Sequence, residues 1–93
     1  MQYPLIHLNG TSPERLLDDY CRAANAVRAA IEAVQLAAPN LRDYYPLEPA
    51  CWNTAIGEHQ ARMDRLRSVL AELEQLAEYA CDWADRKGAS VGG

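Results

Sequence analysis

The 93-residue chain contains no phenylalanine, and aromatic residues make up only 8% of it. β-Sandwiches and β-barrels need many aromatic and β-branched side chains, so this composition argues against both folds. No apolar run approaches the roughly 18 residues of a membrane-spanning helix, so we expect no contact with a membrane. The N-terminus also lacks the basic segment and apolar core of a secretory signal peptide, which favours a cytoplasmic protein.

Basic residues are outnumbered by acidic ones: 9 Lys and Arg stand against 13 Asp and Glu, and the formal net charge is -4. Proteins that bind nucleic acids neutralise phosphates with basic side chains, so this balance weighs against a nucleic acid as partner. Apolar residues make up 49% of the chain and charged residues 24%. These fractions are typical of a globular protein, and the length allows one small domain over residues 1–93.

Cysteine is sparse, and its three positions, Cys21, Cys51 and Cys81, form no C-x-x-C motif. Neither of the two histidines, His7 and His59, stands in a local signature with a cysteine. The pattern therefore predicts no metal site, no cofactor and no catalytic cysteine. We interpret the thiols as small, buried, hydrophobic side chains in a reducing cytosol.

Apolar residues recur at steps of three and four over residues 12–38, which predicts an amphipathic helix there. Two start signals compete. Thr11 with Glu14 fits a capping box, whereas Ser12 with Pro13 fits an N-cap followed by proline at the first helical position. The predicted apolar seam of this helix consists of Leu17, Tyr20, Ala24, Val27, Ile31, Val34 and Ala38.

The same spacing predicts a second helix over residues 50–86. Residues 39–49 form a connector that holds three prolines, which forbid a regular helix. Lys87 and Gly88 are expected to close the second helix and leave a flexible tail at residues 87–93. The predicted seam of the second helix consists of Trp52, Ile56, His59, Met63, Leu66, Leu70, Leu73, Ala77, Ala80 and Ala84.

Two heptad helices joined by a short connector predict an all-α fold, an antiparallel, coiled-coil-like two-helix hairpin. Residues 1–10 are expected to form an extended arm that packs on the C-terminal half of the second helix. Leu5, Ile6 and Leu8 would there meet Leu76, Tyr79 and Trp83. A second apolar stripe from Val69 to Trp83 is wider than one partner helix can cover, so we expect a homodimer that forms a four-helix bundle.

Polar residues concentrate before the first helix, at His7, Asn9, Gly10, Thr11 and Ser12. A helix N-terminus offers backbone N–H groups and a partial positive charge to an anion. Hydroxyl groups add donors, and glycine permits close approach, so this segment is a candidate anion-binding or phosphate-binding site. The alternative is a turn followed by ordinary helix capping.

A second candidate cluster lies in the connector at Arg42, Tyr44 and Tyr45, with His59 and Arg62 on the second helix. Arginine binds phosphate or carboxylate with a forked geometry, and tyrosine rings stack on a base. The alternatives are structural. The tyrosines would cap the bundle end, Arg42 would pair with its neighbour Asp43, His59 would belong to the core, and Arg62 to a solvated ion-pair face.

The two clusters lie at opposite ends of a single hairpin. An antiparallel dimer would bring the start of the first helix of one subunit beside the connector of the other. Two composite sites would result, each combining phosphate-type donors, an arginine and stacking aromatics. This combination suits a small, nucleotide-like anion.

Three stretches of sequence carry a resemblance: HLNGTSPERL, APNLRDYYP, and the group of Glu58, His59 and Arg62. They resemble a group of small proteins encoded by tailed bacteriophages and prophages of Gram-negative and actinobacterial hosts, over most of residues 7–80. The resemblance implies an accessory phage gene acting in the host cytosol. Proteins of this kind are often anti-defence factors, and some of those sequester nucleotide immune signals without cleaving them.

The sequence supports two classes of function. The first is a non-enzymatic binder of a small ligand, and the alternative is a helical module that binds a host or phage protein through an apolar face. An enzyme is not expected, because no nucleophile–base pair stands at a spacing that shares a helix face, and no residue is identified that would activate water.

Overall fold

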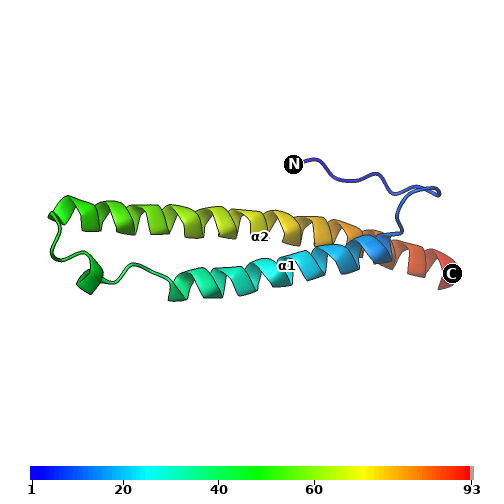
Figure 1. The fold of residues 1–93 in the computed structure, drawn as a ribbon. Coiled ribbons are helices and arrows are strands. Elements are labelled where there is room, and N and C mark those ends of the chain that lie inside the picture. Colours follow the sequence, from blue (N-terminus) through cyan, green and yellow to red (C-terminus); the bar gives the residue numbers. More distant parts are fainter. Residues whose placement is uncertain (93) are drawn as a thin grey trace.

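The computed structural model is a long helical hairpin (Figure 1). Helix α1 spans Pro13–Leu36, a short 3-10 helix η1 spans Leu41–Asp43, and helix α2 spans Pro49–Gly92. The structure describes the backbone of residues 1–92 and the side chains of residues 1–86. Over these residues the chain contains no strand, and the two helices pack against each other, which confirms the predicted all-α hairpin.

Helix α1 starts where the Ser12-Pro13 signal predicts. The Ser12 side chain accepts a hydrogen bond from the backbone N–H of Arg15 at 3.2 Å, and Pro13 occupies the first turn. The competing capping box at Thr11 is therefore not the cap that forms. The helix ends at Leu36, two residues before the predicted end, and the Ala37 N–H donates to the carbonyls of Ala33 and Val34.

Helix α2 begins at Pro49, within one residue of the expected start, but it continues to Gly92. The predicted end at residue 86 is therefore wrong. Glycine costs about 1 kcal/mol relative to alanine inside a helix, far less than proline, so Gly88 alone does not terminate α2. The tail that was predicted to be flexible covers residues 87–93. The side chains of residues 87–92 and the whole of residue 93 lie outside the part of the chain that the structure describes.

The predicted seam forms the contact between the helices. Ala24, Met63 and Ala80 are buried apolar residues with 3%, 3% and 0% of their surface exposed, and His59 is buried at 8%. Every other predicted seam residue is half-buried except Ala38, which lies beyond the end of α1. The heptad pattern therefore identifies the packed face of each helix correctly.

One ion pair shows the register of the hairpin. The Arg28 Nη2 atom on α1 lies 3.2 Å from the Glu74 Oε1 atom on α2. Each residue directly follows a seam residue, Val27 on α1 and Leu73 on α2, so both occupy the same heptad position. The pair therefore lies along one edge of the antiparallel hairpin. Its position defines which residues of α1 and α2 face each other along that edge.

The N-terminal arm docks on α2 at Tyr79, as predicted, but it does so through Tyr3 and Pro4. The rings of Tyr3 and Tyr79 lie 4.8 Å apart between centroids, and the Tyr79 hydroxyl donates to the Pro4 carbonyl at 3.0 Å. Leu5 and Leu8 are 77% and 98% exposed, so the contacts predicted for these two leucines are wrong. Tyrosine holds the arm because its ring supplies apolar area while its hydroxyl satisfies a backbone carbonyl.

The molecule is much more extended than a compact domain. Its dimensions are 68 × 21 × 19 Å and its radius of gyration is 19.9 Å, against about 12 Å for a compact chain of this length. The accessible surface is 6819 Å², where a compact monomer of this mass exposes roughly 5,400 Å². No large side chain among those described is fully buried. Within the described residues, no helix combines the length and apolar character needed to cross a bilayer.

Ala80, the most deeply buried residue of the seam, provides a test of the helix packing. Ala80→Leu should lower the free energy of unfolding by about 1–3 kcal/mol, because the larger side chain overpacks the seam. Ala61→Leu is the matched control: Ala61 is exposed on the same helix, and the change should alter stability by only a few tenths of a kcal/mol. Urea unfolding followed by circular dichroism measures both. Equal effects at the two positions would contradict the packing described here.

Candidate functional site

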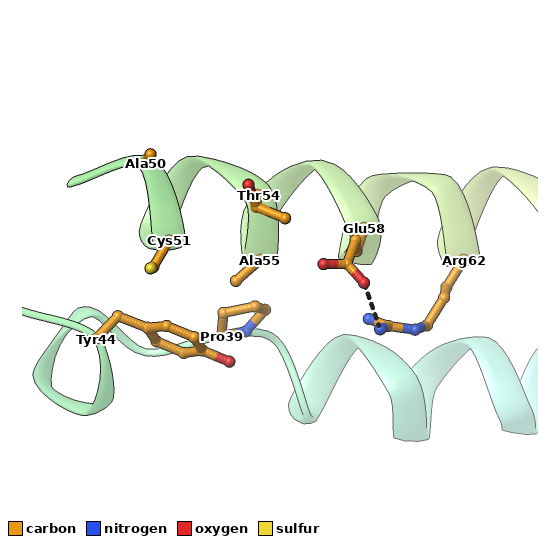
Figure 2. A pocket seen from close by; sticks show the side chains of 8 residues that line it. All are labelled: Pro39, Tyr44, Ala50, Cys51, Thr54, Ala55, Glu58 and Arg62. Carbon is orange, nitrogen blue, oxygen red and sulfur yellow. Dashed lines mark ion pairs between the residues drawn. The ribbon is translucent and has the colours of Figure 1, made fainter. Parts of the chain in front are cut away.

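A hollow of about 440 Å³ lies at the connector end of the hairpin (Figure 2). One wall comes from the connector and the other from the first turns of α2, where Cys51 and Ala55 point toward Tyr44 and Pro39. The hollow is lined by Pro39, Tyr44, Ala50, Cys51, Thr54, Ala55, Glu58 and Arg62.

The connector separates its two tyrosines. Both backbone N–H groups donate to the Leu41 carbonyl, at 2.9 Å from Tyr44 and 2.8 Å from Tyr45. Tyr44 turns inward, where its ring lies 5.7 Å from the Trp52 ring and forms part of the hollow. Tyr45 is 72% exposed and does not line the hollow. One predicted tyrosine therefore belongs to the site and the other does not.

Arg62 supplies the positive charge of the hollow. Its Nη2 atom lies 3.8 Å from the Glu58 Oε2 atom, and the two side chains are 52% and 60% exposed (Figure 2). A carboxylate at this distance is held weakly, because strong charge-assisted hydrogen bonds measure about 2.7–2.9 Å. Arg62 thus keeps the capacity to bind a better-placed anion, while Glu58 can accept hydrogen bonds from hydroxyl or amino groups of the same ligand.

Arg42 is exposed in η1 and does not line the hollow. Its backbone N–H donates to the Asn40 side chain at 3.1 Å, which caps η1. Among the described residues Arg42 forms no ion pair with Asp43, so the structural role considered for Arg42 does not occur here. His59 is buried in the seam at 8% exposure and also lies outside the hollow, which matches the reading of a core histidine.

The cluster before α1 forms a capped turn. The Gly10 N–H donates to the His7 carbonyl at 3.1 Å, and a Cβ atom at Gly10 would lie 2.7 Å from the His7 Nε2 atom. A side chain at Gly10 would therefore require the exposed His7 ring to move. Asn9 and Thr11 are exposed beside the turn.

The start of α1 offers an anion few backbone donors. Pro13 has no N–H, the Arg15 N–H donates to the Ser12 hydroxyl, and the Leu16 N–H donates to the Ser12 carbonyl at 3.0 Å. An anion at this helix end would compete with these hydrogen bonds. The geometry thus favours the capping interpretation of Ser12 over a phosphate site built on the helix terminus alone.

The structure therefore brings Tyr44 and Arg62 together and leaves the arm cluster at the other end of the hairpin (Figure 1). Sequence reasoning missed the remaining lining residues, notably Cys51, Thr54 and Ala55. Cys51, Ala55, Glu58 and Arg62 follow one another at steps of four and three on α2. This stripe runs beside the seam, and its proximity to a proline-rich connector is the signal that would have located the hollow.

No family model, curated protein or solved structure matches the chain. Within the described residues there is also no group of three or more His, Cys, Asp or Glu side chains placed to hold a metal ion. The functional interpretation of the site therefore depends on its own geometry and chemistry.

The capping geometry generates a direct prediction. Ser12→Ala should lower the free energy of unfolding by about 1 kcal/mol, because the Arg15 N–H loses its acceptor. Thr11→Ala is the matched control, since Thr11 is exposed and does not provide the cap, and it should change stability by less than about 0.5 kcal/mol. Chemical denaturation of both variants measures the difference. A larger loss from Thr11→Ala would show that the capping box forms in solution.

Proposed function

We propose that this chain is a non-enzymatic binding protein that holds a small, anionic, nucleotide-like ligand in the hollow at the connector end. One observation carries the proposal: an aromatic ring, a hydroxyl group and a guanidinium group, from Tyr44, Thr54 and Arg62, line the same hollow. The volume of about 440 Å³ lies within the range of small-molecule sites.

Each group has a defined role in this proposal. The Tyr44 ring provides a face on which a planar base can stack, and its contact with Trp52 holds that ring in place. Arg62 binds the phosphate or carboxylate of the ligand through two parallel hydrogen bonds, which displace the weak contact with Glu58. Thr54 and Glu58 select for hydroxyl or amino groups on the ligand.

We further propose that the chain is a homodimer, an antiparallel four-helix bundle. The surface exceeds that of a compact monomer by about 1,400 Å², which is more than the roughly 800 Å² that each partner of a stable interface buries. Exposed apolar residues also lie in the arm and in and beside the connector. Met1, Tyr3, Leu5 and Leu8 form the arm patch, and Leu36, Leu41, Tyr45 and Leu47 form the connector patch.

A two-fold antiparallel dimer places the arm patch of each subunit against the connector patch of its partner, which covers both at once. The same arrangement brings the His7-to-Ser12 turn of one subunit toward the hollow of the other. His7, Asn9 and Thr11 are exposed and would contribute polar contacts to a composite site. This proposal retains the predicted role of the arm cluster without requiring free backbone donors at the start of α1.

Binding without catalysis is favoured by the chemistry of the hollow. Cys51 is the only nucleophilic thiol among its lining residues, and the one histidine of α2, His59, lies in the seam and outside that lining. A nucleophile needs a base within hydrogen-bond reach. Sequestration of a host signal, the phage-type role that the sequence resemblance implies, stays a prediction.

The ligand proposal is tested by thermal unfolding with a panel of mono-, di- and cyclic nucleotides and ADP-ribose derivatives. A ligand at 100 times its dissociation constant adds about 2.7 kcal/mol, which raises the melting temperature by several degrees. Arg62→Gln should abolish this rise. Arg67→Gln is the matched control, because Arg67 lies on the same helix, is similarly exposed and forms a similar ion pair with Asp64 at 3.8 Å. A rise that persists in Arg62→Gln would contradict the proposal.

The dimer is tested by sedimentation equilibrium, which should give twice the chain mass of 10.3 kDa. Leu8→Asp and Leu36→Asp alter residues that are 98% and 90% exposed in one chain, so each should dissociate the dimer while leaving the helix content of the subunit intact. Ser68→Asp, an exposed position on α2 away from both patches, is the control. Dissociation by the control alone would contradict the proposed arrangement.

A second function is favoured by the two apolar patches if the chain is a monomer in solution. The patches would then offer binding surfaces to a different protein, as expected for a helical interaction module. A monomeric mass together with an unresponsive nucleotide panel selects this function over the first.

A further inference from the structure

Two of the three cysteines occupy matching positions on the two helices. Cys21 on α1 directly follows the seam residue Tyr20, and Cys81 on α2 directly follows the seam residue Ala80. Both therefore hold the heptad position that follows a seam residue, as Arg28 and Glu74 do. Positions of this kind face each other along one edge of an antiparallel pair of helices.

The Arg28–Glu74 ion pair shows which residues of α1 and α2 lie level with each other. Cys21 lies seven residues before Arg28, and Cys81 lies seven residues after Glu74. A shift of one heptad along both helices leads from one pair to the other, so the cysteines face each other one heptad closer to the open end of the hairpin. The 3.2 Å contact between Arg28 and Glu74 shows that side chains at this edge meet across the helices.

Two small, buried residues lie in the seam beside the cysteines. Ala24 and Ala80, the two most deeply buried alanines at 3% and 0% exposure, flank the pair in the seam. Small side chains let two helix axes approach toward the lower end of the usual 8–10 Å separation. A disulfide needs Cα atoms within about 4.4–6.8 Å, and the small side chains of this alanine layer favour a close approach of the two helices beside the cysteines.

Nearby groups interact with the Cys81 thiol and change its pKa. Its Sγ atom donates to the Asp85 Oδ2 atom at 4.0 Å. The negative charge of Asp85 raises the pKa of Cys81, followed by burial and by the charges of Asp82, Cys21 and Glu78. The influence of Cys21 agrees with the register. Cys21 is exposed and Cys81 is half-buried, so an oxidant meets Cys21 first.

We propose that Cys21 and Cys81 form a redox-active thiol pair that closes a reversible disulfide between α1 and α2 when the chain meets a low-molecular-weight disulfide such as oxidised glutathione. The Cys21 thiolate attacks the oxidant, forms a mixed disulfide and releases one glutathione thiolate. The Cys81 thiolate then attacks the Cys21 sulfur and releases the second glutathione. Two protein thiols are oxidised, one glutathione disulfide is reduced to two thiols, and the two protons go to the products.

The bond would fasten the end of the hairpin that the connector leaves open. The connector already joins the helices at the other end, where Cys51 lies. A disulfide that closes a long loop restricts the unfolded chain strongly, so the oxidised form resists unfolding. The proposal depends on the helix register alone and not on the ligand or the dimer.

The test uses the full chain with Cys51→Ser, which removes the third thiol. After incubation with oxidised glutathione, the intact mass should fall by two hydrogen atoms. Trypsin should then release peptides 16–22 and 68–86 as one linked species, because cleavage after arginine places the two cysteines on different peptides. The melting temperature should rise by roughly 10 °C and return on reduction.

Two controls separate the proposed bond from other chemistry. The first control moves the second thiol to the outer face of α2, with Cys81→Ser and Glu78→Cys in the same background. The new thiol keeps acidic neighbours but no longer faces Cys21, so the linked peptide should be absent. Mixing ¹⁵N-labelled and unlabelled chains distinguishes a bond within one chain from a bond between two. Linkage only between chains, stable mixed disulfides at both thiols, or a fall in melting temperature on oxidation would each overturn the proposal.

Discussion

The structure depends on one narrow seam between two helices. Small and medium apolar side chains repeat at steps of three and four on α1 and α2, and Ala24, Met63 and Ala80 are the only apolar seam residues that the described part of the chain buries by itself. Because a single seam covers only one side of each helix, most seam residues stay half-buried. The extended shape, the large surface and the exposed apolar ends all follow from this limited burial.

The seam also divides the hairpin into two unlike edges. One edge carries the Arg28–Glu74 ion pair and, by the heptad register, Cys21 and Cys81, which are polar or reactive groups suited to solvent. The other edge carries Val69, which is 44% exposed, and the half-buried Leu76 and Trp83. An apolar edge favours association with a second helical pair, whereas a polar edge is best left exposed. The proposed dimer and the proposed disulfide therefore use different surfaces and do not compete.

The hairpin could be predicted from the sequence because its signal is local and repeated. Each seam residue is one of many that obey the same spacing, so the period survives errors at single positions. The choice between Thr11 and Ser12 as cap could not be predicted, since both satisfy the same rule and only the backbone conformation selects between them. The docking of Tyr3 on Tyr79, rather than of Leu5 and Leu8, depends on a hydrogen bond to the Pro4 carbonyl that no pattern reveals. The hollow was predicted in part. The residue types of Tyr44 and Arg62 indicated binding chemistry, whereas Thr54 and Ala55 line the hollow only because of their position in the fold.

The acidic character of the chain limits how an anion can bind. The net charge of -4 repels anions at long range, and a dimer doubles this repulsion. Salt at physiological strength screens charges beyond about 8 Å, so the distant acidic residues of α2 contribute little at the connector end. The neighbours of Arg62 matter more, and Glu58, the carboxylate paired with it, is also the group that an anion bound by Arg62 would displace. Selectivity would then come from the free energy lost when Glu58 leaves Arg62. A ligand with a hydroxyl or amino group would offset this loss by donating a hydrogen bond to Glu58, whereas inorganic phosphate would not.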